Sequence, residues 1–335
     1  MLKFYKIMFF ISLMIGTLIA ISSYSWMSMW IGLEINLLSM IPLLSNPQNI
    51  FPSESALKYF ITQALASVIF LFSIIMTLNM TEIFPQNSMF TIMMNSALLT
   101  KMGAAPFHAW FPEVMEGLNW TNCLIMLTWQ KIAPMILLMY NLNMTMFLFC
   151  IISFSSIIGS ILGLNQISLR KILAYSSMNH IGWMIASMLN YQITWMIYFL
   201  IYSIINLNII LIFKYQNIYY LKQLNNTLNF DKTFKFFLMM NFLSLGGLPP
   251  FLGFLPKWLT INNLVLNNFH LLSILLILFT LITLFFYLRL IFSILIINTN
   301  EILITQNEKL NYSIIFFNLI SLSGLLTCTM IFNLT

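Results

Sequence analysis

Long apolar runs follow one another along almost the whole chain and restrict its fold more than any other feature. About 20 apolar residues are enough for a helix to cross a bilayer. Because a backbone in lipid must satisfy its own hydrogen bonds, we expect an all-α polytopic membrane protein. Of the residues, 60% are hydrophobic and 7% charged, against about 25% charged in a soluble domain. The sequence predicts about eleven transmembrane helices, at 5–22, 25–45, 54–79, 88–116, 119–140, 144–164, 169–189, 193–213, 236–260, 269–297 and 311–332.

Two of these runs are interrupted by glycine and proline in the same pattern. Residues 98–113 read LLTKMGAAPFHAWFPE, and residues 243–257 read LSLGGLPPFLGFLPK. Proline removes a backbone donor and clashes with the preceding turn, so we predict two discontinuous helices. Paired interruptions in two halves of a membrane protein indicate a transport site. The interrupting residues are Gly103, Pro106, Gly247, Pro249 and Pro250.

Basic residues between the spans predict the orientation. If the N-terminus faces inside, the inside segments hold nine Lys and Arg residues and the outside segments hold none, which matches the positive-inside rule. The two interrupted spans are five apart, so the halves would enter the membrane in opposite senses, as in an antiporter-like inverted repeat. We expect a single membrane domain over 1–335, with five-helix repeats at 1–143 and 144–300 and an extra helix in 301–335.

Ionisable residues lie near the centres of several predicted spans. Such a residue costs at least about 2.5 to 3.5 kcal/mol on insertion, so each needs a partner, water or a function. Glu34, Lys101, Lys131 and His180 lie near span centres, and Lys257 follows the second interruption. Burial favours the neutral form of a lysine, whereas a nearby carboxylate favours the charged form. The row therefore predicts proton translocation, with Glu34 and Lys101 as the candidate pair.

Several of these residues, and His108 in the first interruption, also have a structural interpretation. Glu34 and Lys101 would form a static buried salt bridge, and Lys257 would extend to the membrane surface. His108 and His180 would be hydrogen-bonded packing residues rather than members of a proton relay.

No redox centre is encoded in the sequence. The three cysteines lie far apart in apolar runs, without metal-ligand spacing. A phosphate loop, a dinucleotide fingerprint and an iron–sulfur cysteine set are all missing. We therefore expect no cofactor and no metal in this chain, and any redox centre must belong to another chain.

Four segments resemble a known family. SESALKYFITQALAS, LLTKMGAAPFHAWFPEV, LRKILAYSSMNHIGWM and LGGLPPFLGFLPKW are similar to segments of subunit 2 of mitochondrial NADH–ubiquinone oxidoreductase (respiratory complex I), of animal and insect-like type. The resemblance covers nearly the whole chain. It implies a core membrane subunit of a proton-pumping NADH:ubiquinone oxidoreductase. NADH, FMN, iron–sulfur clusters and ubiquinone would then be held by other subunits.

The resemblance also implies roles for single residues. The family's membrane glutamate falls on Glu34, its broken-helix lysine on Lys101, its central lysine on Lys131 and its distal lysine on Lys257. Lys58 is also a family position, although by its predicted depth it would be an interfacial anchor.

The same resemblance implies a location and partners. The chain would lie in the mitochondrial inner membrane, with its N-terminus in the matrix and its C-terminus in the intermembrane space. Other complex I membrane subunits, neighbouring antiporter-like subunits among them, and lipids such as cardiolipin would contact it; nucleic acid would not. Antiporter-like subunits have fourteen helices and the animal subunit lacks the first three, so neighbours or lipid must cover one flank.

Two other functions stay open. The family also resembles subunits of cation/proton antiporters, so the fold alone allows a sodium or potassium transporter. A third interpretation is a structural spacer that transmits conformational change without a proton path of its own.

Overall fold

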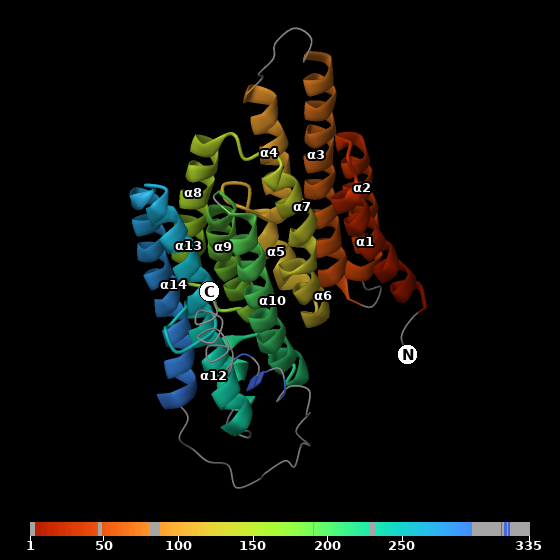
Figure 1. Cartoon of the computed structure of the whole chain (residues 1–335). Helices are drawn as coiled ribbons and strands as arrows, with labels where there is room; N and C mark the ends of the chain where they lie inside the picture. Colours follow the sequence, from red (N-terminus) through yellow and green to blue (C-terminus); the bar gives the residue numbers. More distant parts are fainter. Residues whose placement is uncertain are drawn as a thin grey trace. The chain divides into compact units, whose positions relative to one another are not determined.

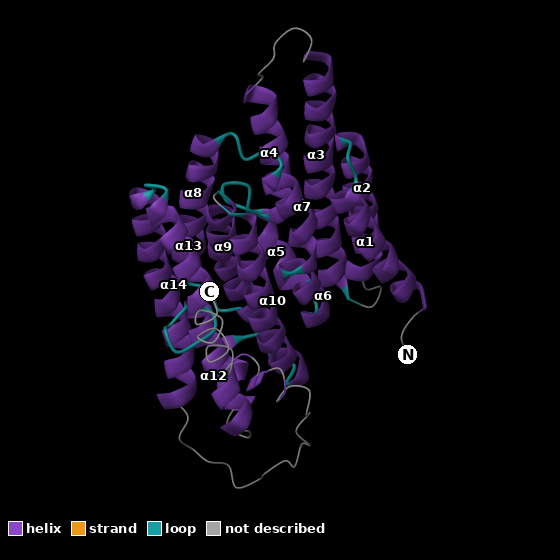
Figure 2. Cartoon of the chain, in the orientation of Figure 1, coloured by secondary structure: helices purple, strands orange, loops and turns teal. Residues whose placement is uncertain are grey.

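The computed structural model describes residues 4–45, 49–80, 88–189, 191–227 and 232–296, together with residues 316, 318, 319 and 321. Within these residues the chain is helical, as Figure 2 shows, and the one β pairing is an isolated bridge between Ser168 and Tyr220. The prediction of an all-α fold is confirmed. The chain divides into two compact units, Met1–Phe154 and Ser155–Thr335.

The first unit contains seven helices and the start of an eighth. Helices α1, α2 and α3 lie side by side (Figure 1), and α4, α5 and α7 pack against them. The helices are α1 (Phe4–Ser22), α2 (Trp26–Leu44), α3 (Ile50–Met80), α4 (Ser88–Met102), α5 (Trp110–Gly117), α6 (Trp120–Leu127), α7 (Trp129–Met139) and α8 (Thr145–Gly163), which crosses the boundary between the units.

In the second unit, helices α10 and α14 pack against the helices around them. Helix α10 packs against α9, α12 and α13, and α14 packs against α12 and α13. The helices are α9 (Leu169–Met188), α10 (Gln192–Tyr215), α11 (Leu221–Thr227), α12 (Lys232–Gly246), α13 (Phe254–Leu266) and α14 (His270–Ile296).

The predicted interruptions correspond to real gaps between helices. The span predicted at 88–116 is α4 followed by α5, and the span predicted at 236–260 is α12 followed by α13. The span predicted at 119–140 has a local interruption at Thr128, between α6 and α7, which the sequence did not indicate. The eleventh predicted span, 311–332, lies almost wholly outside the described residues. The total of eleven transmembrane helices and the boundaries of the two five-helix repeats stay predictions.

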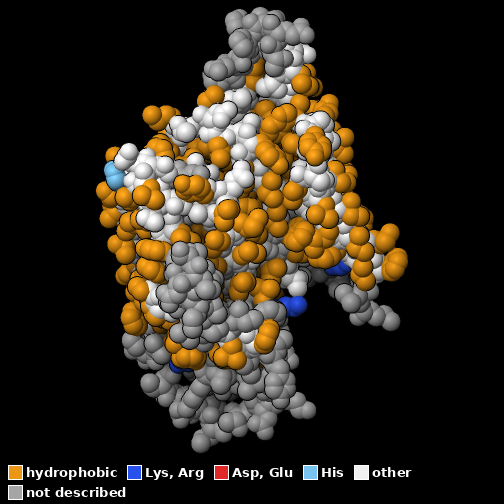
Figure 3. All heavy atoms as spheres, in the orientation of Figure 1, with side chains coloured by type: hydrophobic (Ala, Val, Ile, Leu, Met, Phe, Trp, Pro, Cys, Tyr) orange, Lys and Arg blue, Asp and Glu red, His pale blue; other side chains and the backbone are white. Residues whose placement is uncertain are grey.

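Apolar side chains face outward and many polar side chains face inward. Hydrophobic atoms cover most of the described surface in Figure 3, and seven stretches of the described residues are long and apolar enough to cross a membrane. Buried polar residues include Asn36, Gln63 and Asn95 in the first unit and Asn179 and Asn241 in the second. This distribution suits a chain whose solvent is lipid, because polar groups then find partners only inside the protein.

Candidate functional site

The first helix break lies between α4 and α5. Gly103 follows the last residue of α4 with a φ of 73°, in the left-handed region that glycine adopts without strain. The carbonyl of Thr100 accepts hydrogen bonds from the Trp110 indole Nε1 at 3.0 Å and from the Gly103 amide at 3.1 Å. The carbonyl of Lys101 accepts one from the Gln63 amide at 3.4 Å. Neutral donors from α5 and α3 therefore satisfy this open helix end.

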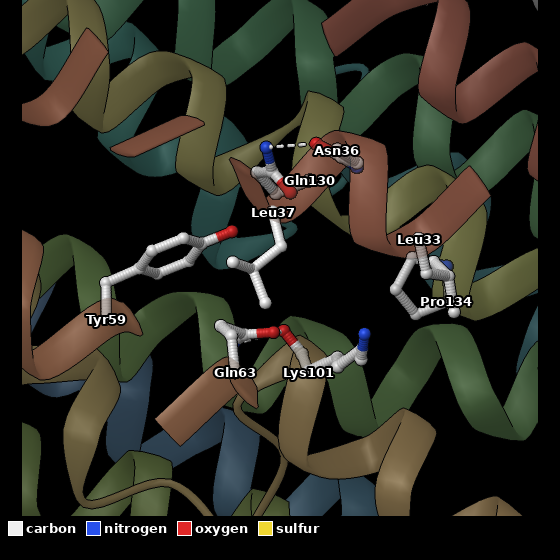
Figure 4. Close-up of a pocket in the computed structure, with 8 residues that line it drawn as sticks. All are labelled: Leu33, Asn36, Leu37, Tyr59, Gln63, Lys101, Gln130 and Pro134. Carbon is white, nitrogen blue, oxygen red and sulfur yellow. Dashed lines mark hydrogen bonds between the residues drawn. The ribbon is translucent and has the colours of Figure 1, made fainter. Parts of the chain in front are cut away.

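The Lys101 side chain lines a small polar cavity at this break. Lys101 is 7% exposed, and its ammonium makes no hydrogen bond or ion pair with the described residues. The volume of the cavity that the centre of a water molecule can occupy is about 10 Å³. This is room for about one water. Figure 4 shows the lining residues, namely Leu33, Asn36, Leu37, Tyr59, Gln63, Lys101, Gln130 and Pro134.

Glu34 lies on α2, beside the cavity-lining Leu33, and is half-buried. Within the described structure Glu34 and Lys101 form no ion pair, so the static salt bridge considered above is not formed. The Glu34 Oε1 atom is buried and has no hydrogen-bond partner among the described residues. The buried carboxylate oxygen is thus not held by a described side chain or backbone group.

Lys131 lies on α7, three residues after the interruption at Thr128. It is 1% exposed, and its Nζ atom lies 5.7 Å from the centroid of the Phe111 ring, a cation–π contact. The preceding residue, Gln130, lines the cavity and donates to Asn36 Oδ1 at 2.8 Å (Figure 4). The interrupted helix therefore carries the buried lysine directly after a cavity residue.

Lys58 lies at the exposed side of α3 and outside the cavity. Its ammonium pairs with Glu54 at 3.0 Å and with Glu113 of α5 at 2.9 Å. Exposed pairs of this kind contribute little to stability, but this one links α3 to the helix that follows the break. Its role as an interfacial anchor stays a prediction.

The second helix break, between α12 and α13, is built differently. Gly247 again follows the helix end, with a φ of 77°. Lys257, on α13, is 7% exposed and folds back, so that its Nζ donates to the carbonyls of Leu245 at 3.1 Å and Gly246 at 2.8 Å. Lys257 therefore does not extend to the surface. Pro249 and Pro250 lie exposed in the connecting loop.

Gly247 also makes room for this lysine. A Cβ atom at Gly247 would lie 2.7 Å from Cδ and 2.9 Å from Nζ of Lys257. The Lys257 ammonium lies 6.0 Å from the centroid of the Trp183 ring of α9. The lysine thus rests between a helix end and an aromatic face.

The two histidines differ in their surroundings. His180, on α9, is 4% exposed, and its Nδ1 lies 2.9 Å from the Tyr198 hydroxyl. The two residues line a second small cavity with Tyr202 and Ser244. His108 lies in the loop of the first break beside the exposed Pro106, and its Nδ1 is 3.2 Å from the Pro106 carbonyl oxygen.

The site residues fall into two groups, one in each unit. Glu34, Lys101 and Lys131 belong to the first unit, and His180 and Lys257 belong to the second.

Sequence reasoning missed Tyr59, Gln63 and Trp110 at the first break. Gln63 could have been recognised from the sequence, because it is a polar amide side chain within an apolar span. Among the described residues, no three His, Cys, Asp or Glu side chains are grouped to hold a metal.

Comparison with known proteins identifies the family. The family model for the transmembrane region of NADH:quinone oxidoreductase and Mrp antiporter subunits matches residues 23–284. NADH-ubiquinone oxidoreductase chain 2 of Anopheles gambiae is 49% identical over 331 residues, with 97% of each chain covered. The same-named chain of Aedes aegypti is 51% identical over 331 residues, again with 97% of each chain covered.

Solved structures show the same fold at low identity. A chain of respiratory complex I from Thermus thermophilus superimposes with a TM-score of 0.84 at 23% identity, covering 96% of this chain and 78% of that one. A chain of the Mrp complex from a Dietzia species gives a TM-score of 0.75 at 14% identity, with coverages of 85% and 60%. The antiporter-like polytopic fold predicted from the sequence is confirmed. The chain belongs to the NADH-ubiquinone oxidoreductase chain 2 family, within the wider family of antiporter-like membrane subunits.

Proposed function

We propose that this chain is a core membrane subunit of a proton-translocating NADH:ubiquinone oxidoreductase, and that it moves protons through ionisable groups buried among its helices. Quinone reduction in other subunits drives the process. The observation that carries the proposal is the Lys101 ammonium, which lines a water-sized polar cavity at a helix break without a fixed partner among the described residues. A lysine in this setting exchanges its proton more readily than arginine would.

In the proposed mechanism the charge of Glu34 controls the proton on Lys101. When the carboxylate is ionised, the ammonium is stabilised; when the carboxylate is protonated or screened, the lysine releases its proton. Protons pass through bound water towards Lys131, and Lys257 connects towards the far side of the membrane. Lys58, His108 and His180 are further candidates for this relay.

We place the chain in the mitochondrial inner membrane, with the N-terminus in the matrix and the C-terminus in the intermembrane space. The nine basic residues on one side of the predicted topology support this orientation. Neighbouring antiporter-like subunits and lipids such as cardiolipin are the proposed partners. NADH, FMN, iron–sulfur clusters and ubiquinone bind other subunits in this proposal.

Replacement of Lys131 by Met tests the proposal in the assembled complex. The change keeps most of the side-chain bulk and removes the proton site, so proton pumping coupled to NADH oxidation should fall. Lys222→Met is the matched control, because Lys222 is exposed on the short helix α11. A correctly assembled Lys131→Met complex that pumps as well as the control would remove Lys131 from the mechanism and favour a structural spacer.

A second candidate function is a cation/proton antiporter subunit. The family model that matches this chain includes Mrp antiporters, which favours the comparison. Carboxylates are the usual ligands of hard cations, and among the described residues that line the Lys101 cavity there is none. Transport in vesicles that varies with sodium or potassium concentration would support this candidate over the first.

A further inference from the structure

Asn241 is a buried amide near the end of α12. It is 1% exposed. Its Nδ2 atom donates to the Phe237 carbonyl of its own helix at 2.9 Å and to the Asn318 Oδ1 atom. Its Oδ1 atom accepts from the Ser321 hydroxyl at 3.3 Å and from Nδ2 of Asn208 at 3.5 Å. Two donated and two accepted bonds use the whole capacity of an amide side chain.

These hydrogen bonds join three separate stretches of the second unit. Asn208 lies on α10, and Asn318 and Ser321 follow Asn241 by 77 and 80 residues. The three partners are 1% to 3% exposed. Because an amide buried without partners costs free energy, the bonds oppose any displacement of Asn241 from these groups. The turn of α12 that carries Asn241 is therefore fixed against α10 and the C-terminal residues.

The turn that Asn241 fixes continues directly into the second break. The Ser244 hydroxyl donates to the Asn241 carbonyl at 2.8 Å, and the Ser244 carbonyl accepts from the Gly247 amide at 3.0 Å. A Cβ atom at Gly253 would overlap the Ser244 carbonyl oxygen, so the backbone just before α13 lies against this turn. A shift of the turn would therefore move the start of α13.

Lys257 depends on both sides of this contact. It lies in the first turn of α13, and its ammonium donates to the carbonyls of Leu245 and Gly246, one turn of α12 beyond Asn241. The helix that carries the lysine and the carbonyls that hold its ammonium are thus both placed by the end of α12.

We propose that Asn241 is a positioning residue for Lys257, and that Asn318 and Ser321 of the C-terminal region hold Asn241 in place. The inference rests on the proposed function, in which Lys257 connects the proton path towards the far side of the membrane. Asn241 itself neither gains nor loses a proton. It sets where the Lys257 ammonium lies, and the C-terminal residues act on the second break through it.

Asn241→Leu in the assembled complex tests the positioning directly. Leucine has a similar volume and makes none of the side-chain hydrogen bonds, so in a high-resolution map the Lys257 Nζ atom should lie more than about 3.5 Å from both α12 carbonyls. NADH-driven proton pumping should fall about twofold, the effect of one weak hydrogen bond. An ammonium that keeps both bonds would overturn the inference.

Asn267→Leu is the matched control. Asn267 is exposed at the end of α13, and its amide donates at 2.9 Å to the carbonyl of Asn263, four residues earlier, as the amide of Asn241 does to Phe237. The control removes the same kind of local bond away from the network. It should leave the Lys257 ammonium and the pumping rate unchanged.

Lys257→Met separates the inference from the proposed function. If Asn241 acts through Lys257, the double variant should pump no worse than Lys257→Met alone, whereas additive losses would show a purely structural role. If only Lys257→Met slows pumping, the role of Asn241 is wrong and the proposed function stands. If Lys257→Met pumps normally, the path through Lys257 is wrong and the inference falls with it. Should Asn241→Leu not assemble, Asn318→Leu replaces it with the same expectations, because it leaves α12 unchanged.

Discussion

The two helix breaks share a sequence pattern but satisfy their open ends in opposite ways. At the first break, the neutral side chains of Trp110 and Gln63 donate to the last carbonyls of α4, and the ammonium of Lys101 is left to the cavity. At the second break, the ammonium of Lys257 is itself the donor to the last carbonyls of α12. The position of the lysine, before one break and after the other, decides which role its charge takes.

This difference indicates at which of the two breaks the lysine exchanges its proton more easily. An ammonium that donates two hydrogen bonds to a helix end interacts favourably with the partial negative charge there, and moving it disturbs the helix end. An ammonium that faces a water-sized cavity gives up its proton without altering the backbone. We therefore expect substitutions at the second break to affect stability first and those at the first break to affect pumping first.

The largest effect on stability is expected from Lys257→Met. The change leaves the buried carbonyls of Leu245 and Gly246 without their lysine donor, at a cost of about 3 kcal/mol in total. Lys101→Met, the matched variant at the first break, removes no hydrogen bond of this kind and should cost much less. Thermal denaturation of the two assembled complexes, followed on native gels, measures the difference; equal midpoints would show that the breaks are alike.

A smaller loss is expected from Gly247→Ala. The positive φ costs a residue with a side chain about 1 to 2 kcal/mol, and the new Cβ atom displaces the Lys257 side chain from its carbonyls. Gly103→Ala has the same backbone cost, but its Cβ atom meets the Phe111 side chain at 3.0 Å instead. The free energy of unfolding should therefore fall more for Gly247→Ala, and the reverse order would argue against capping by Lys257.

At the first break, Trp110→Phe should lower stability by about 1 kcal/mol. The substitution keeps an aromatic ring but removes the indole N–H that donates to the Thr100 carbonyl. Trp195→Phe in the second unit provides a control for loss of a buried indole away from both breaks. Denaturation of the assembled complex is again the measurement, and an unchanged midpoint would mean that the indole does not cap α4.

The smallest effect on stability is expected from Gln63→Leu. Its hydrogen bond to the Lys101 carbonyl is long, at 3.4 Å, so its loss should cost about 0.5 kcal/mol. The same change makes the cavity wall apolar, and the rate of proton pumping should fall even though the complex assembles. Pumping measured beside NADH oxidation checks this; a stable variant with normal pumping would separate the cavity from proton transfer.

The sequence predicted the interruptions because their cause is local. Glycine and proline disrupt a helix wherever they occur, so the gaps after α4 and α12 could be placed from Gly103, Pro106, Gly247 and Pro250 alone. The interruption at Thr128 has no such marker, since the nearest proline is Pro134. The short helix α11 was missed because its sequence, LKQLNNT, carries no apolar pattern.

The side chains that complete each break could not be predicted from the sequence. Gln63 and Lys101 are 38 residues apart, and no motif connects them. Tyr59 follows Lys58 directly, yet one faces the cavity and the other pairs with carboxylates on the exposed side of the same helix. Lys257 turned back to α12 instead of towards the surface, which depends on the space left by Gly247.

The most direct test of this account is the number of protons pumped per NADH oxidised by an assembled complex carrying Lys101→Met, measured in vesicles beside the unmodified complex. Met removes the exchangeable proton and leaves the hydrogen bonds that Trp110 and Gln63 donate at the first break in place. The account predicts a lower ratio of protons to NADH with no loss of assembly. An unchanged ratio would contradict the claim that the lysine facing the cavity carries protons.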